Sequence, residues 1–229
     1  MQLFIDNHKF PVCLLSDCDG VIVDSEKIAD EIMLEVLRET FANEVLDTHM
    51  KDMFGRRVID IIVLLENRLG ISLSADKRSN MRLHIDSRVA REATAMPEVK
   101  EVYESLGIPV AIVSNSAVDR LRQCVQRAGL MDLVGSNIYS ADQVPNPKPA
   151  PDVYLKAAQT MGFLPQQCLV IEDSVTGVTA AKAAGMRVIG FLGGSHIRPD
   201  HADMLTKAGA QILFDNMTQL PRVIYDLNL

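Results

Sequence analysis

The amino-acid sequence predicts an α/β protein: a doubly wound, Rossmann-like parallel sheet that carries an inserted all-helical cap. Four short and almost uninterrupted apolar runs have the pattern of strands buried on both faces, and helical segments lie between them. Strands that alternate with helices imply parallel pairing with right-handed crossovers. The cap is predicted by about seventy residues of purely helical pattern that follow the first run.

The predicted strands are PVCLLS (11–16), PVAIVS (109–114), QCLVIE (167–172) and RVIGFL (187–192), with weaker candidates at NIYSA and AQILF. A helix is expected over AVDRLRQCVQRAGL after the second strand, ending near Gly129. Another is expected over VTGVTAAKAAGM after the third, where Gly185 is a good helix terminator. These elements assign residues 1–24 and 96–229 to the α/β core.

Residues 25–95 have a different pattern and form the predicted helical cap. The segments SEKIADEIMLEVLRETFA and RRVIDIIVLLENRLG place apolar residues at helical spacing with charged residues between them. The segment ADKRSNMRLHIDSRVAREA predicts a third, more polar helix. We expect hinges near Ser25 and Met96, where the helical region joins the core.

Composition and charge exclude several classes of function. The chain has 229 residues, of which 48% are hydrophobic and 23% charged, as in ordinary soluble domains. Its net charge of -7 argues against non-specific nucleic-acid binding, which needs a basic face. No apolar run reaches the ~18 residues of a membrane span. The start MQLFIDNHKF lacks a signal-peptide pattern, so a cytoplasmic protein is expected.

The four cysteines form no C-x-x-C pair and are expected to be reduced, buried thiols. Cys18 lies between two aspartates, but no histidine close in sequence could serve it as a base. We therefore interpret Cys18 as a packing residue rather than a nucleophile.

Polar side chains follow three of the predicted strands at the edge where an open parallel sheet binds its ligands. A fourth group comes from the proline-rich loop NPKPAPDVY, which presents a lysine just ahead of a helix. Together these segments deliver Asp17, Asp19, Ser114, Asn115, Ser116, Lys148, Glu172, Asp173 and Ser174 to one rim.

Each residue type at this rim suits a phosphoryl-transfer site. Carboxylates are ligands for Mg²⁺, which would also relieve the repulsion between Asp17, Asp19 and Asp173. A serine hydroxyl, backbone amides and a lysine suit a phosphate group. Metal and lysine together can offset the charge of a transferring phosphoryl group.

Any one of these signals alone is weak. A D-x-D motif is more often a turn, Ser114-Asn115 a helix cap, and a loop lysine simply exposed. Asp24 is interpreted as a helix N-cap. His196 and His201 lie in a polar stretch without a carboxylate or cysteine at metal spacing, and we assign them no role. The argument depends on all four segments arriving in order at predicted strand ends.

The motifs DCDGVIVDSE, VSNS, NPKPAPD and VIEDSVTGVTAAKAAGM resemble those of the haloacid dehalogenase superfamily, in its branch with a helical cap after the first strand. The resemblance runs through almost the whole core. The cap matches the family in its position in the chain and in its helical character, but much less in its amino-acid residues. An acid at Asp19 sets the chain apart from the dehalogenases, which lack it, and favours phosphoryl transfer.

The resemblance implies a role for each motif residue. Asp17 would be the nucleophile that forms an aspartyl-phosphate, and Asp19 the general acid and base. Mg²⁺ would be held by the Asp17 carboxylate, the Asp19 main-chain carbonyl and Asp173, with Glu172 in or next to that shell. Ser114 and Asn115 would hold the phosphate, which Lys148 would neutralise. The implied activity is hydrolysis of a small-molecule phosphoester such as a sugar phosphate or sugar-acid phosphate.

Two other functions remain open. A β-phosphoglucomutase-type mutase shares the four motifs, but such mutases usually carry a histidine early in the first cap helix, where this chain has EKIADE (26–31). A non-catalytic binding protein would be expected to lack Asp17, Asp19 or Lys148, and all three are present. In the cap, Gly55-Arg56-Arg57 is predicted to lie at a turn, where Arg56 could contact the leaving group.

Overall fold

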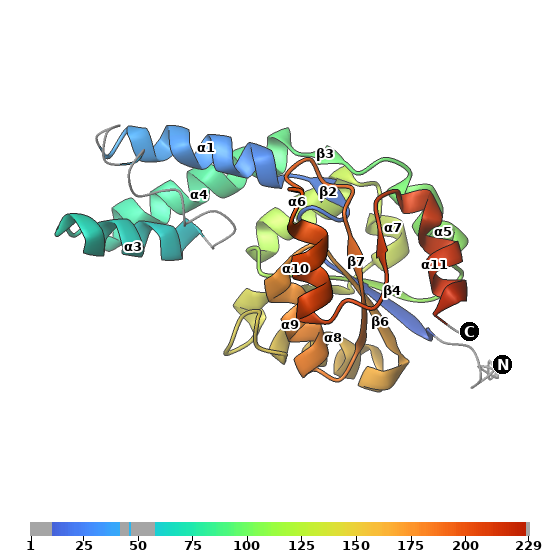
Figure 1. Cartoon of the computed structure of the whole chain (residues 1–229). Helices are drawn as coiled ribbons and strands as arrows, with labels where there is room; N and C mark the ends of the chain where they lie inside the picture. The colour runs from blue at the N-terminus through green and yellow to red at the C-terminus, as the bar shows by residue number, and fades with distance from the viewer. Residues whose placement is uncertain (1–10, 42–45, 47–57, 228–229) are drawn as a thin grey trace.

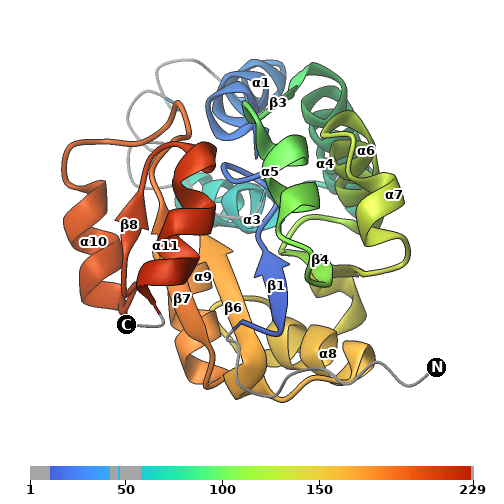
Figure 2. The same cartoon turned by 90° about the vertical axis from the view of Figure 1, so that its right-hand side faces the viewer.

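A computed structural model describes residues 11–41, 46 and 58–227. Its core is a six-stranded, all-parallel sheet in the order β5-β4-β1-β6-β7-β8. The strands are β1 (Cys13–Ser16), β4 (Val110–Ser114), β5 (Ile138–Ser140), β6 (Cys168–Glu172), β7 (Arg187–Phe191) and β8 (Leu213–Phe214). Figure 2 shows β1 and β6 side by side near the middle of the sheet. All four strongly apolar runs and both weaker candidates are therefore strands, and the predicted fold class is confirmed.

Successive side chains of a strand point to opposite sides of the sheet, so the apolar strands give it two apolar faces. Helices cover both faces. Leu14 and Ile112 face a cluster completed by α5 (Val99–Ser105), α6 (Val118–Arg127), α7 (Met131–Val134) and α11 (Leu220–Asp226). Leu15 and Val113 face the opposite cluster, completed by α8 (Asp152–Met161), α9 (Val175–Ala183) and α10 (His201–Ala208). Strands buried on both faces explain why the sequence runs are apolar without alternation.

Among the described residues, three helices form a lobe beside the sheet, hereafter the helical lobe: α1 (Glu26–Arg38), α3 (Val58–Leu69) and α4 (Ala75–Glu92). They lie next to one another and away from the strands (Figure 1). They surround a hydrophobic cluster of their own that includes Leu37, Leu65 and Val89. None of the described helices combines the length and apolar character needed to cross a membrane.

A short antiparallel ribbon joins the helical lobe to the core, which the sequence did not predict. It pairs β2 (Val23–Asp24) with β3 (Thr94–Ala95). The expected N-cap role of Asp24 is wrong: Ser25 precedes α1, and the Asp24 carboxylate accepts bonds from Ser195 N at 3.1 Å and Ser195 Oγ at 2.9 Å. Two-residue strands are too short for an alternation pattern to reveal them.

All four cysteines are buried and carry free thiols. Cys18 is fully buried in the cluster on the α6 side of the sheet, where its thiol meets that of Cys124. The interpretation of Cys18 as a packing residue is confirmed.

Candidate active site

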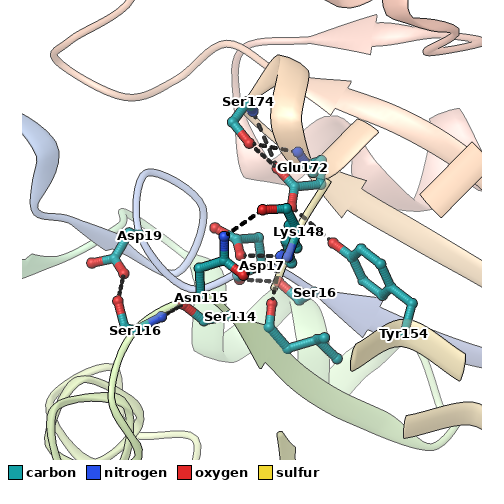
Figure 3. A network of polar contacts seen from close by, with 12 residues as sticks. Ser16, Asp17, Asp19, Ser114, Asn115, Ser116, Lys148, Tyr154, Glu172 and Ser174 are labelled. Atoms are coloured by element: carbon teal, nitrogen blue, oxygen red, sulfur yellow. Dashed lines mark hydrogen bonds and ion pairs between the residues drawn. The ribbon is translucent and has the colours of Figure 1, made fainter. Parts of the chain in front are cut away.

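A buried lysine connects the ends of three strands (Figure 3). The Lys148 ammonium donates to Asp17 Oδ1 at 2.6 Å, to Glu172 Oε1 at 2.7 Å and to the Val113 carbonyl at 2.8 Å. Burial alone would lower the pKa of Lys148, but Asp17 and Glu172 outweigh it and raise that pKa well above its usual value. Lys148 is therefore a fixed positive charge beside Asp17.

The loop that carries Lys148 is held in place by Asn115. The Asn115 side chain accepts a bond from Lys148 N at 2.9 Å and donates one to the Lys148 carbonyl at 3.1 Å. Both polar atoms of this amide are thus used on the lysine loop. The side chain of Asn115 thus holds the Lys148 loop, and the phosphate contact that the resemblance implies for Asn115 stays a prediction.

Glu172 is fully buried, and its carboxylate accepts a hydrogen bond from Lys148. Its Oε1 accepts a bond from Tyr154 at 2.8 Å, and its Oε2 accepts bonds from Ser174 N at 3.1 Å and Ser174 Oγ at 2.9 Å. This close packing explains the glycine in α9, because a Cβ on Gly177 would lie 1.6 Å from Glu172 Oε1.

Three carboxylates meet next to the lysine. Oxygen atoms of Asp17, Glu172 and Asp173 lie within 4.8 Å of one another, and all three residues are buried. Burial and then repulsion from Glu172 raise the pKa values of both Asp17 and Asp173 well above the usual range. Gly20, with φ of +76°, allows this approach, because a Cβ there would lie 1.8 Å from Asp173 Oδ2.

Asp19 belongs to a separate set of contacts on the Ser116 side of the site (Figure 3). Its Oδ1 accepts bonds from Arg120 and from Ser25 Oγ at 2.5 Å, and its Oδ2 accepts one from Ser116 Oγ at 2.6 Å. Burial alone would raise the pKa of Asp19, but Arg120 and the two serines together lower it. In this arrangement Asp19 is an ionised hydrogen-bond acceptor.

Arg120 also connects Asp19 to the helical lobe. Its Nη1 lies 3.5 Å from Asp86 Oδ1 on α4, while its Nη2 pairs with Asp19. The sequence reasoning missed Arg120. A usable signal was present: Arg120, Leu121, Cys124 and Val125 share one buried face of α6, and an arginine on such a face needs a partner.

Two histidines hold Asp173. His196 Nε2 lies 3.2 Å from Asp173 Oδ2, and His201 Nε2 lies 2.5 Å from the Asp173 carbonyl oxygen. Assigning these histidines no place at the site was wrong. Their carboxylate partner lies more than twenty positions away in sequence, so the search for metal-ligand spacing could not find it.

A cavity of about 650 Å³ opens above these groups, between the strand ends and the helical lobe. The core contributes Asp17, Asp19, Ser114, Lys148 and Asp173, and the lobe contributes Ala29, Asp30, Met33, Ile59, Arg82 and Asp86. A ligand here would contact the site with one end and the lobe with the other.

Comparison with known proteins identifies the family. The model of haloacid dehalogenase-like hydrolases matches residues 12–185, which is most of the chain. The chain belongs to the haloacid dehalogenase-like hydrolases.

Similar proteins share the fold, and the relatives with curated names include phosphatases. A haloacid dehalogenase-like protein of unknown function from Agrobacterium tumefaciens superposes with a TM-score of 0.79, at 37% identity over 96% of this chain and 100% of that one. A family hydrolase from Deinococcus radiodurans, solved with bound phosphate and sodium, has a TM-score of 0.73 at 32% identity, over 96% and 97% of the two chains. Hexitol phosphatase B of Escherichia coli is 29% identical over 76% of this chain and 80% of its own. This haloacid dehalogenase-like hydrolase is a phosphoric monoester hydrolase.

Most residues selected from the sequence of this hydrolase lie around one cavity. Asp17, Asp19, Ser114, Asn115, Lys148, Glu172 and Asp173 all line it. Arg56 and the turn predicted around it lie outside the described residues. The roles of these residues are taken up below.

Proposed function

We propose that this chain is a Mg²⁺-dependent phosphatase that hydrolyses a small sugar phosphate or sugar-acid phosphate through an aspartyl-phosphate on Asp17. The observation that carries the proposal is the buried ion pair of Asp17 with Lys148, at the floor of a cavity roofed by the helical lobe. A nucleophilic carboxylate next to a fixed cation suits attack on a phosphoryl group, because the cation offsets the charge of both reactants.

The reaction proceeds in two displacements. The Asp17 carboxylate attacks phosphorus, the bond from phosphorus to the ester oxygen breaks, and the leaving oxygen takes a proton from Asp19. Water then attacks the phosphoryl group, the bond from phosphorus to Asp17 breaks, and the proton of that water goes to Asp19. Lys148 stays charged throughout and neutralises the phosphoryl oxygens.

Asp19 suits the second displacement in its present position. Its ion pair with Arg120 keeps the carboxylate ionised and ready to accept a proton. To act as the acid in the first displacement, Asp19 must be protonated and turned toward the leaving group. We therefore assign the contacts of Asp19 with Ser25, Ser116 and Arg120 to the state before substrate is bound and to the phosphorylated state that water attacks.

The carboxylates of Asp17 and Asp173 fit a divalent cation of the Mg²⁺ class. They are hard oxygen donors, buried close together, with pKa values raised by burial and mutual repulsion that a cation would relieve. The main-chain carbonyl of Asp19 is a third donor in this assignment. Glu172 lies next to the site, and its bonds to Lys148, Tyr154 and Ser174 make it a support. When bound, the ion supplies positive charge that polarises the phosphoryl oxygens.

Ser114 and the backbone around Asn115 form the proposed phosphate site. Ser114 is buried, lines the cavity, and its Oγ accepts a bond from Ser116 N at 3.0 Å, which leaves its hydroxyl proton for a phosphate oxygen. Asn115 acts mainly through Lys148, because its side chain is bonded to that loop.

The helical lobe, within residues 25–95, is proposed to act as the cap that selects the leaving group. Its polar residues Asp30, Arg82 and Asp86 offer acceptors and a donor to a hydroxylated substrate. A hydroxyl-rich ester agrees with the relative named hexitol phosphatase B. Arg56 remains a predicted contact in the same region. The buried free thiols agree with a cytoplasmic location.

A phosphate-release screen tests this proposal. The panel contains hexitol phosphates, sugar phosphates and sugar-acid phosphates, assayed with Mg²⁺, and Asp17→Asn serves as the inactive control. We expect free phosphate from at least one hydroxylated ester without a sugar bisphosphate primer. Conversion of β-glucose 1-phosphate to glucose 6-phosphate with little free phosphate would establish the mutase instead. No turnover of any ester would overturn the proposal.

A further inference from the structure

Two histidines that have no part in the proposed steps converge on one aspartate. His196 follows β7, and His201 is the first residue of α10. Their rings meet edge to face with centroids 5.6 Å apart. One contacts the carboxylate of Asp173 and the other its main-chain carbonyl, so the same residue is held at both ends.

The chemistry of the partners fixes which ring nitrogens carry protons. A carbonyl oxygen only accepts hydrogen bonds, so His201 donates from Nε2 to Asp173. His196 Nε2 faces Asp173 Oδ2 at 3.2 Å, and this favours a proton on that nitrogen, because a carboxylate only accepts. Both rings thus point an Nε2 atom at an oxygen of Asp173.

The surroundings of His196 are shaped to seat its ring. A Cβ on Gly194 would lie 2.7 Å from His196 Cε1, and a Cβ on Gly20 would lie 3.0 Å from the same atom. Glycines at both positions leave room for the imidazole between the two loops. The ring is mostly buried, with 19% of the side chain exposed.

We propose that His196 and His201 are positioning residues for the divalent-cation site, acting through Asp173. This rests on the proposed function, since Asp173 is there a ligand of the ion. A residue whose carboxylate and backbone carbonyl both contact neighbouring side chains loses little freedom when the ion binds. Hydrogen bonds from outside the ligand set typically change metal affinity by ~10- to 100-fold.

Direct contact of His196 with the substrate is the competing role, because His196 and His201 also line the cavity. The two roles differ in what they change. A substrate contact would alter KM for the ester and leave the affinity for the ion unchanged. A positioning role would weaken ion binding even with no substrate present.

Mn²⁺ binding, followed by electron paramagnetic resonance on the full chain without substrate, separates these roles. The variants are His196→Ala, His196→Gln and His201→Gln, with Asp173→Asn to identify the site. His84→Gln is the matched control, because His84 is exposed on α4. Circular dichroism and thermal melting check that each variant folds.

We expect His196→Ala to weaken Mn²⁺ binding by ~10- to 100-fold. His196→Gln, which can still donate from its amide, should recover part of the affinity, and His84→Gln should match wild type. If His196→Ala proves unfolded, the glutamine variants at both positions carry the test. Wild-type affinity in folded His196 and His201 variants would overturn the inference alone. Absence of Mn²⁺ binding by the wild type would overturn the metal site and the inference with it.

Discussion

At the scale of single residues, Lys148 determines the charge balance of the site. It is 5% exposed and contacts two carboxylates that would otherwise be buried without a counter-charge. Removing one partner of a buried ion pair usually costs more than the pair contributes, because the remaining charge is left uncompensated.

We expect Lys148→Met to lower kcat by at least ~100-fold and the free energy of unfolding by roughly 3 kcal/mol. The matched control is Lys156→Met, an exposed lysine on α8, which should change neither quantity. Steady-state kinetics and urea denaturation measure the two effects. Wild-type kcat in Lys148→Met would remove the lysine from the mechanism.

Asp30 gives a pH-dependent prediction. Burial raises its pKa from 3.8 to about 6, against the opposite effect of His196. The folded state therefore binds this proton more tightly than the unfolded state, and stability is lost as pH rises from about 4 through 6. A shift of two units corresponds to roughly 3 kcal/mol, which partial exposure of Asp30 reduces.

Asp30→Asn should remove this loss. The unfolding free energy of the variant relative to wild type should increase by about 1 to 2 kcal/mol between pH 4 and pH 7, measured by urea denaturation. A flat difference for Asp30→Asn would contradict the raised pKa.

At the scale of elements, α6 and α4 are joined by one side chain. Arg120 of α6 contacts Asp19 in the core and also Asp86 on α4, so a change at Asp86 can reach Asp19 through Arg120, in addition to any contact of Asp86 with the substrate. The effect that passes through Arg120 disappears without it.

A double-mutant cycle on kcat/KM tests this connection. Arg120→Gln should lower kcat by about tenfold or more, because Asp19 loses the donor that fixes its carboxylate. Asp86→Asn should have a larger effect in the wild-type background than in Arg120→Gln, with a coupling energy above ~0.5 kcal/mol. Arg122→Gln, exposed on the same helix, is the control. Strict additivity would show that the two helices act independently.

The same elements show what could be predicted from the sequence. The strands and the rim residues were found because apolar runs and strand ends are local signals, as at Asp17 and Lys148. Arg120, His196 and His201 reach their carboxylates only through tertiary placement, and no spacing rule connects them. The bonds that Ser195 donates to Asp24 were missed for the same reason, and the β2–β3 ribbon was missed because its strands are also too short to show a pattern.

At the scale of the whole molecule, the core supplies the chemistry and the helical lobe closes the cavity above it. Burial of several carboxylates at the strand ends is electrostatically costly, and the proposed divalent cation would offset that cost. The proposed cation requirement would therefore be a property of the assembled fold.

Chelation should stop turnover completely, and added Mg²⁺ should restore it. Ca²⁺ should restore turnover poorly, because its larger and less rigid coordination shell would misplace the Asp17 nucleophile. Mg²⁺ should also raise the melting temperature, since it binds the folded state alone. Full activity in the presence of chelator would contradict the metal assignment.

The most direct test of the central claim is to detect the phosphoryl group on Asp17. The enzyme is mixed with a turned-over ester and Mg²⁺, quenched in acid within the first turnovers, and digested for mass spectrometry. The account predicts a phosphorylated peptide that contains Asp17 from the wild-type enzyme. Folded Asp17→Asn should form no adduct, and its turnover should be lowered by several orders of magnitude. Rapid turnover without an adduct, together with more than a few per cent of activity in folded Asp17→Asn, would contradict it.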